Sequence, residues 1–136
     1  MGGAMRELGL APDIVLVSPS LRTRETLAAL EPLDDSPLIE VLEPLYLAPA
    51  PRLLHMLQGI AETARSVLLI GHNPGLQELV LELSGAGRRS DLEAIRTKFP
   101  TAGLAVLNFT ATRWADATPK TGILRLFMSP RRLPVA

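Results

Sequence analysis

The sequence contains no cysteine. This absence excludes disulfide bonds, thiolate nucleophiles and zinc–cysteine sites, and it fits a reducing compartment such as the cytoplasm. Aromatic residues make up only 4% of the chain although 47% of it is hydrophobic, so the core must be built from aliphatic side chains. Fourteen basic residues balance fourteen acidic ones. Because a nucleic-acid-binding protein normally carries a basic excess, this balance argues against such a partner.

Long apolar runs are lacking as well. No stretch approaches the ~18 apolar residues of a membrane span, and residues 1–7 contain no hydrophobic segment of a signal peptide. We therefore expect a cytoplasmic protein without a membrane partner. The two histidines, His55 and His72, stand far apart and the carboxylates are not clustered, so the sequence predicts neither a metal site nor a cofactor. Its 136 residues are typical of one domain, spanning 1–136.

Short apolar runs alternate with segments of helical periodicity. Ile14–Val17 and Val67–Ile70 are continuous apolar runs, which are typical of strands buried on both faces. An aliphatic stripe over residues 53–64 predicts an amphipathic helix. Segments 103–109 and 123–128 are predicted to be strands that form an antiparallel pair. The alternation predicts a layered α/β domain with a mostly parallel sheet flanked by helices.

Caps and glycines predict the ends of several elements. Gly9 is expected to end a short helix over residues 1–8, and Gly85 to end a helix that begins near residue 76. Residues 90–93 form a capping-box pattern that predicts the start of another helix. A short strand is predicted over residues 38–42, and the helix that follows Pro19 is expected to run to about Leu30.

The two apolar runs end in similar strand-to-helix junctions. Ser18-Pro19 follows the first run and Asn73-Pro74 the second, so each junction has a cap and then a proline at the predicted first helical position. Free backbone N–H groups at helix starts attract anions, and ligand sites of open α/β sheets lie beyond the carboxyl ends of strands. The junctions therefore predict a shared anion pocket.

Four side chains are candidates for chemistry at this pocket. His72 ends the second run; the alternative is a histidine that merely caps a strand. Arg22 can grip a phosphate through two parallel hydrogen bonds, or else form a salt bridge with Glu25. Glu43 can protonate a leaving group, or be an ordinary loop carboxylate. Thr101 can offer a hydroxyl near the pocket, or be a turn residue.

Four blocks resemble motifs of the histidine phosphatase superfamily, and their order along the chain fits that family as well. Residues 18–26 (SPSLRTRET) resemble its S-P-x-x-R-x-x-Q-T motif, with Glu25 where the family usually has glutamine. Residues 71–74 (GHNP) resemble its G-H-x-P block. Residues 43–46 and 98–101 look like further blocks of the SixA-like phosphohistidine phosphatases. The resemblance implies a phosphoglycerate mutase-like three-layer sandwich that removes phosphate from phosphohistidine or a small phosphomonoester through a phosphohistidine intermediate.

The sequence departs from the family at its beginning. The family opens with a central strand ending in Arg-His-Gly or Arg-His-Ala, whose histidine is the nucleophile, and this chain has no Arg-His pair. A misplaced start codon, a shortened chain and real degeneration would each explain the difference. The resemblance assigns Arg22 as a phosphate clamp, His72 as the second histidine and Glu43 as the acid, with Ser18 and Thr101 among the substrate-binding residues. Without a nucleophile we expect no activity; the alternative is a non-catalytic phosphate-binding module.

The resemblance also has a consequence for stability. Without the family's first strand, two neighbouring strands would have unpaired edges, and such edges promote pairing with another chain. We therefore expect low stability, or self-association through the unpaired edges.

Overall fold

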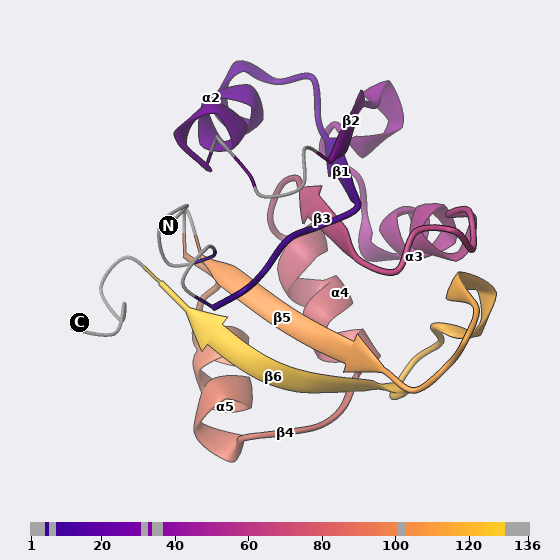
Figure 1. The fold of residues 1–136 in the computed structure, drawn as a ribbon. Coiled ribbons are helices and arrows are strands. Elements are labelled where there is room, and N and C mark those ends of the chain that lie inside the picture. Colours follow the sequence, from indigo (N-terminus) through magenta and orange to yellow (C-terminus); the bar gives the residue numbers. More distant parts are fainter. Residues whose placement is uncertain (1–4, 6–7, 31–32, 34–36, 101–102, 130–136) are drawn as a thin grey trace. The chain divides into compact units, whose positions relative to one another are not determined.

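A computed structural model describes residues 5, 8–30, 33, 37–100 and 103–129 (Figure 1). The chain folds into two compact units, one built from Met1–Ala48 with Thr63–His72 and the other from Pro49–Glu62 with Asn73–Ala136. That residues 1–136 form a single domain stays a prediction. Among the described residues, no helix has the length and apolar character needed to span a membrane.

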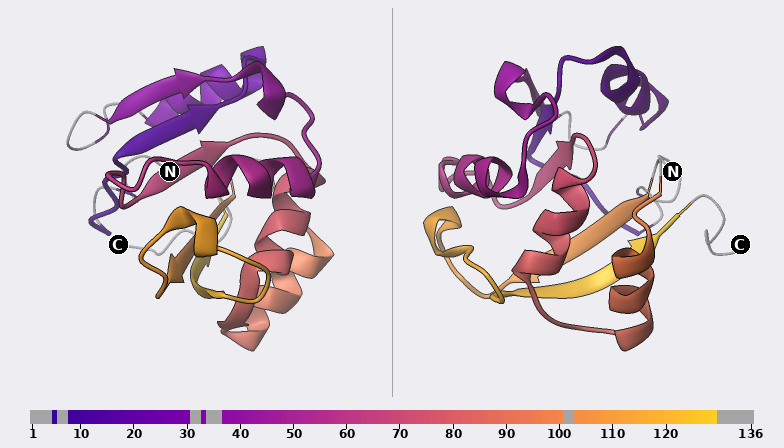
Figure 2. Two further views of the ribbon diagram at one scale, coloured as in Figure 1. Left: turned by 90° about the vertical axis from the view of Figure 1, so that its right-hand side faces the viewer. Right: turned by 180° about the vertical axis from the view of Figure 1, so that it is seen from behind.

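The first unit contains a parallel sheet of three strands in the order β2-β1-β3 (Figure 2). The central strand β1 (Ile14–Val17) pairs with β2 (Leu38–Val41) on one side and with β3 (Val67–Ile70) on the other. Helix α2 (Leu21–Leu30) packs on β1 and β3 and buries Leu27 and Leu30. These elements confirm both strands predicted from the apolar runs, the short strand near residues 38–42 and the predicted α/β class with a parallel sheet. Strand β1 is buried as predicted, whereas only Ile70 of β3 is buried and its other residues are partly exposed.

The hydrogen bonds between β1 and β3 show which backbone groups of β3 face β1. Ile14 and Ser18 of the β1 segment donate to the carbonyls of Ser66 and Ile70, at 3.3 and 3.1 Å. Because backbone groups of a strand alternate in direction, Leu68 also faces β1, whereas Val67 and Leu69 direct their N–H and C=O groups away from it. No described residue pairs with that outer edge of β3. Self-association through it stays a prediction.

The segment before β1 closes with a glycine. Gly9 has φ of +71°, and the N–H of Leu10 donates to the carbonyl of Met5 at 2.9 Å, which is the bond that ends a helical turn in a Schellman motif. The prediction that Gly9 ends this element is confirmed. Most of the predicted helix over residues 1–8 lies outside the described residues.

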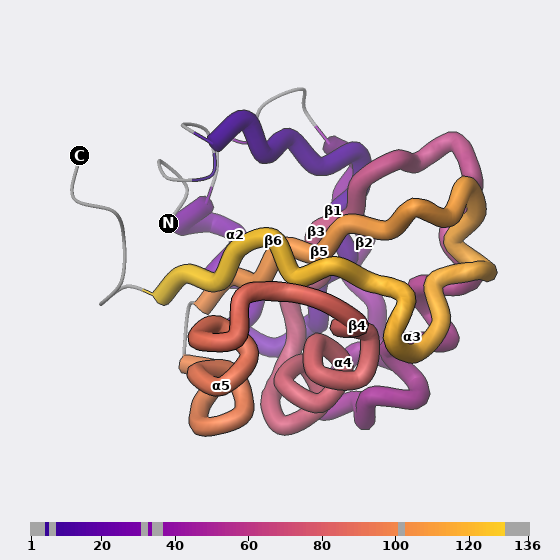
Figure 3. Tube along the Cα trace, turned by 90° about the horizontal axis from the view of Figure 1, so that it is seen from below, coloured from indigo at the N-terminus to yellow at the C-terminus, as the bar shows by residue number. Residues whose placement is uncertain are grey.

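The second unit combines helices with a mixed sheet. Its elements are α3 (Ala50–Gln58), α4 (Gly75–Leu83), β4 (Ser84–Gly87), α5 (Arg89–Thr97), β5 (Leu104–Phe109), a 3₁₀ turn η2 (Trp114–Asp116) and β6 (Gly122–Met128). The strand order is β4-β6-β5, with β5 antiparallel and β4 parallel to β6. The predicted antiparallel pair is thus confirmed. Helices α4 and α5 lie side by side (Figure 3), and Val80, Ile95, Leu124 and Phe127 form the buried core.

Two predicted helix boundaries are wrong, and a third is met by a different cap. Helix α3 ends at Gln58, because the N–H of Gly59 turns back to the carbonyls of its last turn, so the stripe up to residue 64 is not one helix. Helix α5 begins at Arg89 without a capping box: Ser90 lies inside the helix and Glu93 pairs with Arg89 at 3.3 Å. Helix α4 ends with Ser84 as its C-cap, directly before Gly85 as predicted, but Gly85 has no positive φ: Ser84 Oγ donates to the carbonyl of Val80 and Gly85 enters β4.

Gly85 provides a direct test of how β4 is held. A Cβ atom at this position would lie 1.9 Å from the carbonyl oxygen of Lys120, which is backbone and cannot rotate away. Gly85→Ala should therefore lower the free energy of unfolding by about 3 kcal/mol, as measured by urea denaturation. Gly59→Ala is the control, since its Cβ would meet nothing closer than 3.7 Å. Equal stability of the two variants would contradict this account of β4.

Candidate functional site

Ser18 and His72 meet beyond the carboxyl ends of two adjacent strands. Strand β1 ends at Val17 and β3 ends at Ile70, and these two residues are partners in the parallel ladder. The chain therefore leaves both strands at the same edge of the sheet. Ser18 is fully buried, and its Oγ lies 2.8 Å from Nε2 of the half-buried His72. The structure thus brings together two residues that the sequence placed 54 positions apart.

The loop between β1 and α2 differs from its prediction. Ser20, rather than Ser18, caps α2: its Oγ accepts the N–H of Thr23 at 3.3 Å, and the helix begins at Leu21. Ser18 is free for His72 because the next serine takes over the cap. Pro19 therefore lies before the N-cap of α2. Pro74 is itself the N-cap of α4 and not its first helical residue. The prediction of a proline at the first helical position is wrong at both junctions.

Thr23 holds the backbone that carries Ser18. It is 4% exposed, and its Oγ1 donates to the carbonyl of Ser18 at 2.7 Å and lies 2.8 Å from Ser20 Oγ. The loop is therefore tied to the first turn of α2 through hydroxyl groups. Sequence reasoning missed this role, although the Ser-x-x-Thr spacing of residues 20–23 is a recognisable side-chain capping pattern.

Tyr46 is a second neighbour of His72 that sequence reasoning missed. The two rings meet edge to face, with centroids 5.5 Å apart and planes at 77°. Tyr46 is positioned by the 3₁₀ turn η1 (Glu43–Leu45), whose fully buried Leu45 anchors it and whose Glu43 carbonyl accepts the Tyr46 N–H at 3.0 Å. The sequence signal that could have identified Tyr46 is its position just after β2. The carboxyl end of β2 lies at the same sheet edge as the carboxyl ends of β1 and β3.

Arg22 and Glu43 belong to the same unit as this pair. Arg22 is the second residue of α2 and is exposed. Its guanidinium forms no ion pair with a described residue, so the alternative of a salt bridge with Glu25 is not realised there. Glu43 is exposed at the start of η1, beyond the end of β2. The roles of both side chains stay predictions.

The remaining candidates belong to the second unit. Thr101 lies outside the described residues. The block that precedes it is fixed by Asn73, whose Nδ2 donates to the carbonyl of Phe99 at 2.7 Å. His55 is exposed on α3, as expected for a solvated side chain. Within the described ranges, no group of three or more histidine, aspartate or glutamate residues is placed to hold a metal ion.

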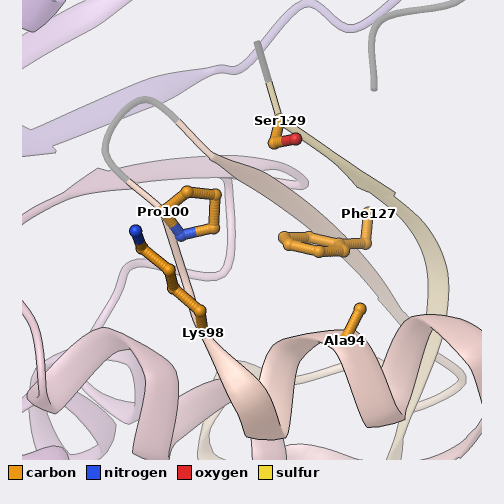
Figure 4. A pocket seen from close by; sticks show the side chains of 5 residues that line it. All are labelled: Ala94, Lys98, Pro100, Phe127 and Ser129. Carbon is orange, nitrogen blue, oxygen red and sulfur yellow. The ribbon is translucent and has the colours of Figure 1, made fainter. Parts of the chain in front are cut away.

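A hollow of about 210 Å³ lies in the second unit (Figure 4). Alanine, proline and phenylalanine make up most of its wall, with one lysine and one serine. Its lining residues are Ala94, Lys98, Pro100, Phe127 and Ser129. It contains none of the described candidate residues, so the candidate site is the cluster around His72.

Two mycobacterial proteins are similar to this chain over almost its whole length. ML1117 of Mycobacterium leprae, an uncharacterized protein, is 34% identical over 133 residues, which cover 96% of this chain and 79% of that protein. Rv1276c of Mycobacterium tuberculosis, also uncharacterized, is 34% identical over 132 residues, covering 96% and 81%. No family model matches the chain.

Three solved structures share the fold. A candidate phosphohistidine phosphatase SixA from Nakamurella multipartitia has a TM-score of 0.79 and 28% identity, covering 95% of this chain and 77% of its own. One from Agrobacterium tumefaciens has a TM-score of 0.76 and 26% identity, covering 95% and 75%. The protein histidine phosphatase SixA complexed with tungstate has a TM-score of 0.71 and 26% identity, covering 98% and 78%. The chain belongs to the histidine phosphatase superfamily, in its SixA-like branch.

The hydroxyl network under the site can be tested by stability. Thr23→Val keeps the shape of the side chain but leaves the Ser18 carbonyl without its buried donor, so the free energy of unfolding should fall by about 1–3 kcal/mol. Thr26→Val is the matched control on the same helix, because Thr26 donates to the carbonyl of Arg22 at an exposed position. Urea denaturation measures both. A loss for Thr26→Val as large as for Thr23→Val would remove the special role of Thr23.

Proposed function

We propose that this domain is a phosphatase of the SixA-like type that acts on phosphohistidine or a small phosphomonoester. The observation that carries the proposal is the 2.8 Å contact between Ser18 and His72 at the carboxyl edge of the parallel sheet. The similarity to SixA structures supports the phosphorylated substrate class. The tungstate complex of one of them supports an oxyanion as the bound group, since tungstate is a tetrahedral anion like phosphate.

In this proposal His72 contacts a phosphoryl oxygen through its remaining ring nitrogen. Nε2 is held by Ser18, and Nδ1 has no hydrogen bond to a described residue. Ser18 Oγ can accept the N–H of Ser20, at 3.5 Å, and donate its own hydrogen to Nε2, which leaves Nδ1 as the N–H donor. A donor aimed at an oxyanion stabilises the charge that develops during phosphoryl transfer. Ser18 thus orients His72.

The other candidates complete the proposed site. The Arg22 guanidinium binds two phosphoryl oxygens, which suits a planar group with parallel N–H donors. Glu43 supplies a proton to the leaving group. That Thr101 offers a hydroxyl to the substrate stays a prediction, because Thr101 lies outside the described residues. The partner is a phosphorylated protein or small phosphoester in the cytoplasm, and no cofactor takes part.

The phosphatase activity is proposed for a chain that carries the family's nucleophile, and the present 136 residues are proposed to bind phosphate without turnover. The histidines of this chain are His72 and His55, and His55 is exposed on α3 of the second unit. Neither corresponds to the nucleophile of the Arg-His-Gly or Arg-His-Ala motif. A non-catalytic phosphate-binding module is the second candidate function, and it is favoured by the same lack of a nucleophile beside an intact Ser18–His72 pair.

Phosphate binding tests the assigned clamp. Arg22→Ala should weaken the binding of inorganic phosphate and of tungstate about 10- to 100-fold by calorimetry, because it removes a charge-assisted bidentate contact. Arg24→Ala is the matched control. Arg24 is an exposed residue of the same helix, and because it lies two positions after Arg22 it is on a different face of the helix. Equal effects of the two substitutions would mean that Arg22 contributes only its positive charge and makes no specific contact with phosphate.

Hydrolysis separates the two candidate functions. With p-nitrophenyl phosphate as substrate, the present chain should bind without releasing nitrophenol. A chain extended at its N-terminus by a strand ending in Arg-His-Gly should release it, because the nucleophile is then supplied. If the extended chain folds and binds phosphate but shows no hydrolysis, the phosphatase proposal fails and the binding module remains.

A further inference from the structure

Strand β2 is exposed to an unusual degree for an apolar strand. Leu38, Ile39 and Val41 are 60%, 40% and 52% exposed, and these positions include both faces of the strand. Aliphatic side chains on a strand usually mark a covered surface, and exposed apolar patches mark interaction sites. We call the segment Leu38–Val41 the β2 edge.

The backbone of the β2 edge is open on the side away from β1. The N–H groups of Leu38 and Leu42 donate to the carbonyls of Asp13 and Val17, at 3.1 and 2.9 Å. Because these groups alternate along a strand, Ile39 and Val41 direct their N–H and C=O groups outward. No described residue pairs with them, since β2 is the last strand of its sheet. The edge therefore presents two donors and two acceptors at a spacing that fits another strand.

Glu40 decides which strand fits. It lies between the two outward-facing residues, is exposed, and forms no ion pair with a described residue. In an antiparallel partner that bonds to both Ile39 and Val41, the residue opposite Glu40 belongs to a non-hydrogen-bonded pair, where side chains come closest. Pairing of β2 with a second copy in this register would set Glu40 against Glu40, and like charges directly opposite are destabilising. A basic residue at that position is stabilising instead.

We propose that the β2 edge binds an extended segment of another protein as an added antiparallel strand. The segment carries a lysine or arginine opposite Glu40, flanked by β-branched apolar residues opposite Ile39 and Val41. Main-chain hydrogen bonds hold the segment, as in other cases of strand addition. The charge opposite Glu40 selects it. The proposal concerns a surface separate from the phosphate contacts and does not depend on catalysis.

The experiment uses two blocked peptides, Ser-Thr-Val-Lys-Val-Thr-Ser and the same sequence with Glu in place of Lys, titrated into the full chain. Backbone amide shifts in ¹H–¹⁵N NMR spectra give the affinity and the location. The Lys peptide should shift Ile39 and Val41 and bind about fivefold more tightly than the Glu peptide. Glu40→Lys should reverse this preference.

Two control variants keep the result interpretable. Glu25→Lys makes the same charge change at an exposed position of α2 and should leave the preference unchanged. Val41→Pro removes an outward N–H, which a strand edge tolerates, and should abolish binding of both peptides while the remaining amide signals stay in place. Equal binding of both peptides to the chain and to Glu40→Lys would overturn the proposal. So would a dimer in sedimentation experiments that Val41→Pro dissociates, because the occupant would then be a second copy.

Discussion

The candidate site depends on the register of two parallel strands. Val17 of β1 lies opposite Ile70 of β3, and the backbone N–H of Ser18 continues this ladder by bonding to Ile70. Both strands therefore end at the same level, which is what places the Ser18 hydroxyl within 2.8 Å of His72. A slip of one residue would turn every side chain of a strand to the opposite face and separate the pair. Burial of the aliphatic strands thus also fixes the polar contact.

The neighbours of His72 have different origins. On one side lies a loop in which Ser18, Ser20 and Thr23 bond to one another and to their own backbone, so that hydroxyl groups in a buried place all find partners. On another side lies the edge of the Tyr46 ring, held by a short turn rather than by regular structure. A ring held by a hydrogen bond and an aromatic contact has little freedom to rotate, which suits a group that must present one nitrogen to an anion.

Sequence reasoning succeeded where the physical signal was strong. Continuous aliphatic runs identified β1 and β3, and the rule that ligands bind beyond strand ends pointed to Ser18 and His72. It failed where neighbouring residues compete. Two serines in the loop after β1 can both cap a helix, and only the tertiary contact with His72 decides that Ser20 does so. Strand β4 (Ser84–Gly87) is glycine-rich and lacks strand propensity; it forms because the backbone of another segment approaches Gly85 closely. Tyr46 was missed because its partner lies on another strand.

The position of each strand in the sheet has a consequence for motion near His72. Strand β1 is bonded on both sides, so Ser18 extends from the most constrained strand of its unit, whereas Tyr46 follows β2 and His72 follows β3, each of which pairs only with β1 among the described residues. Edge segments open locally at a lower free-energy cost than central ones. The serine is therefore the most firmly held of the three groups, whereas the imidazole and the tyrosine both extend from edge strands and can move at a lower free-energy cost.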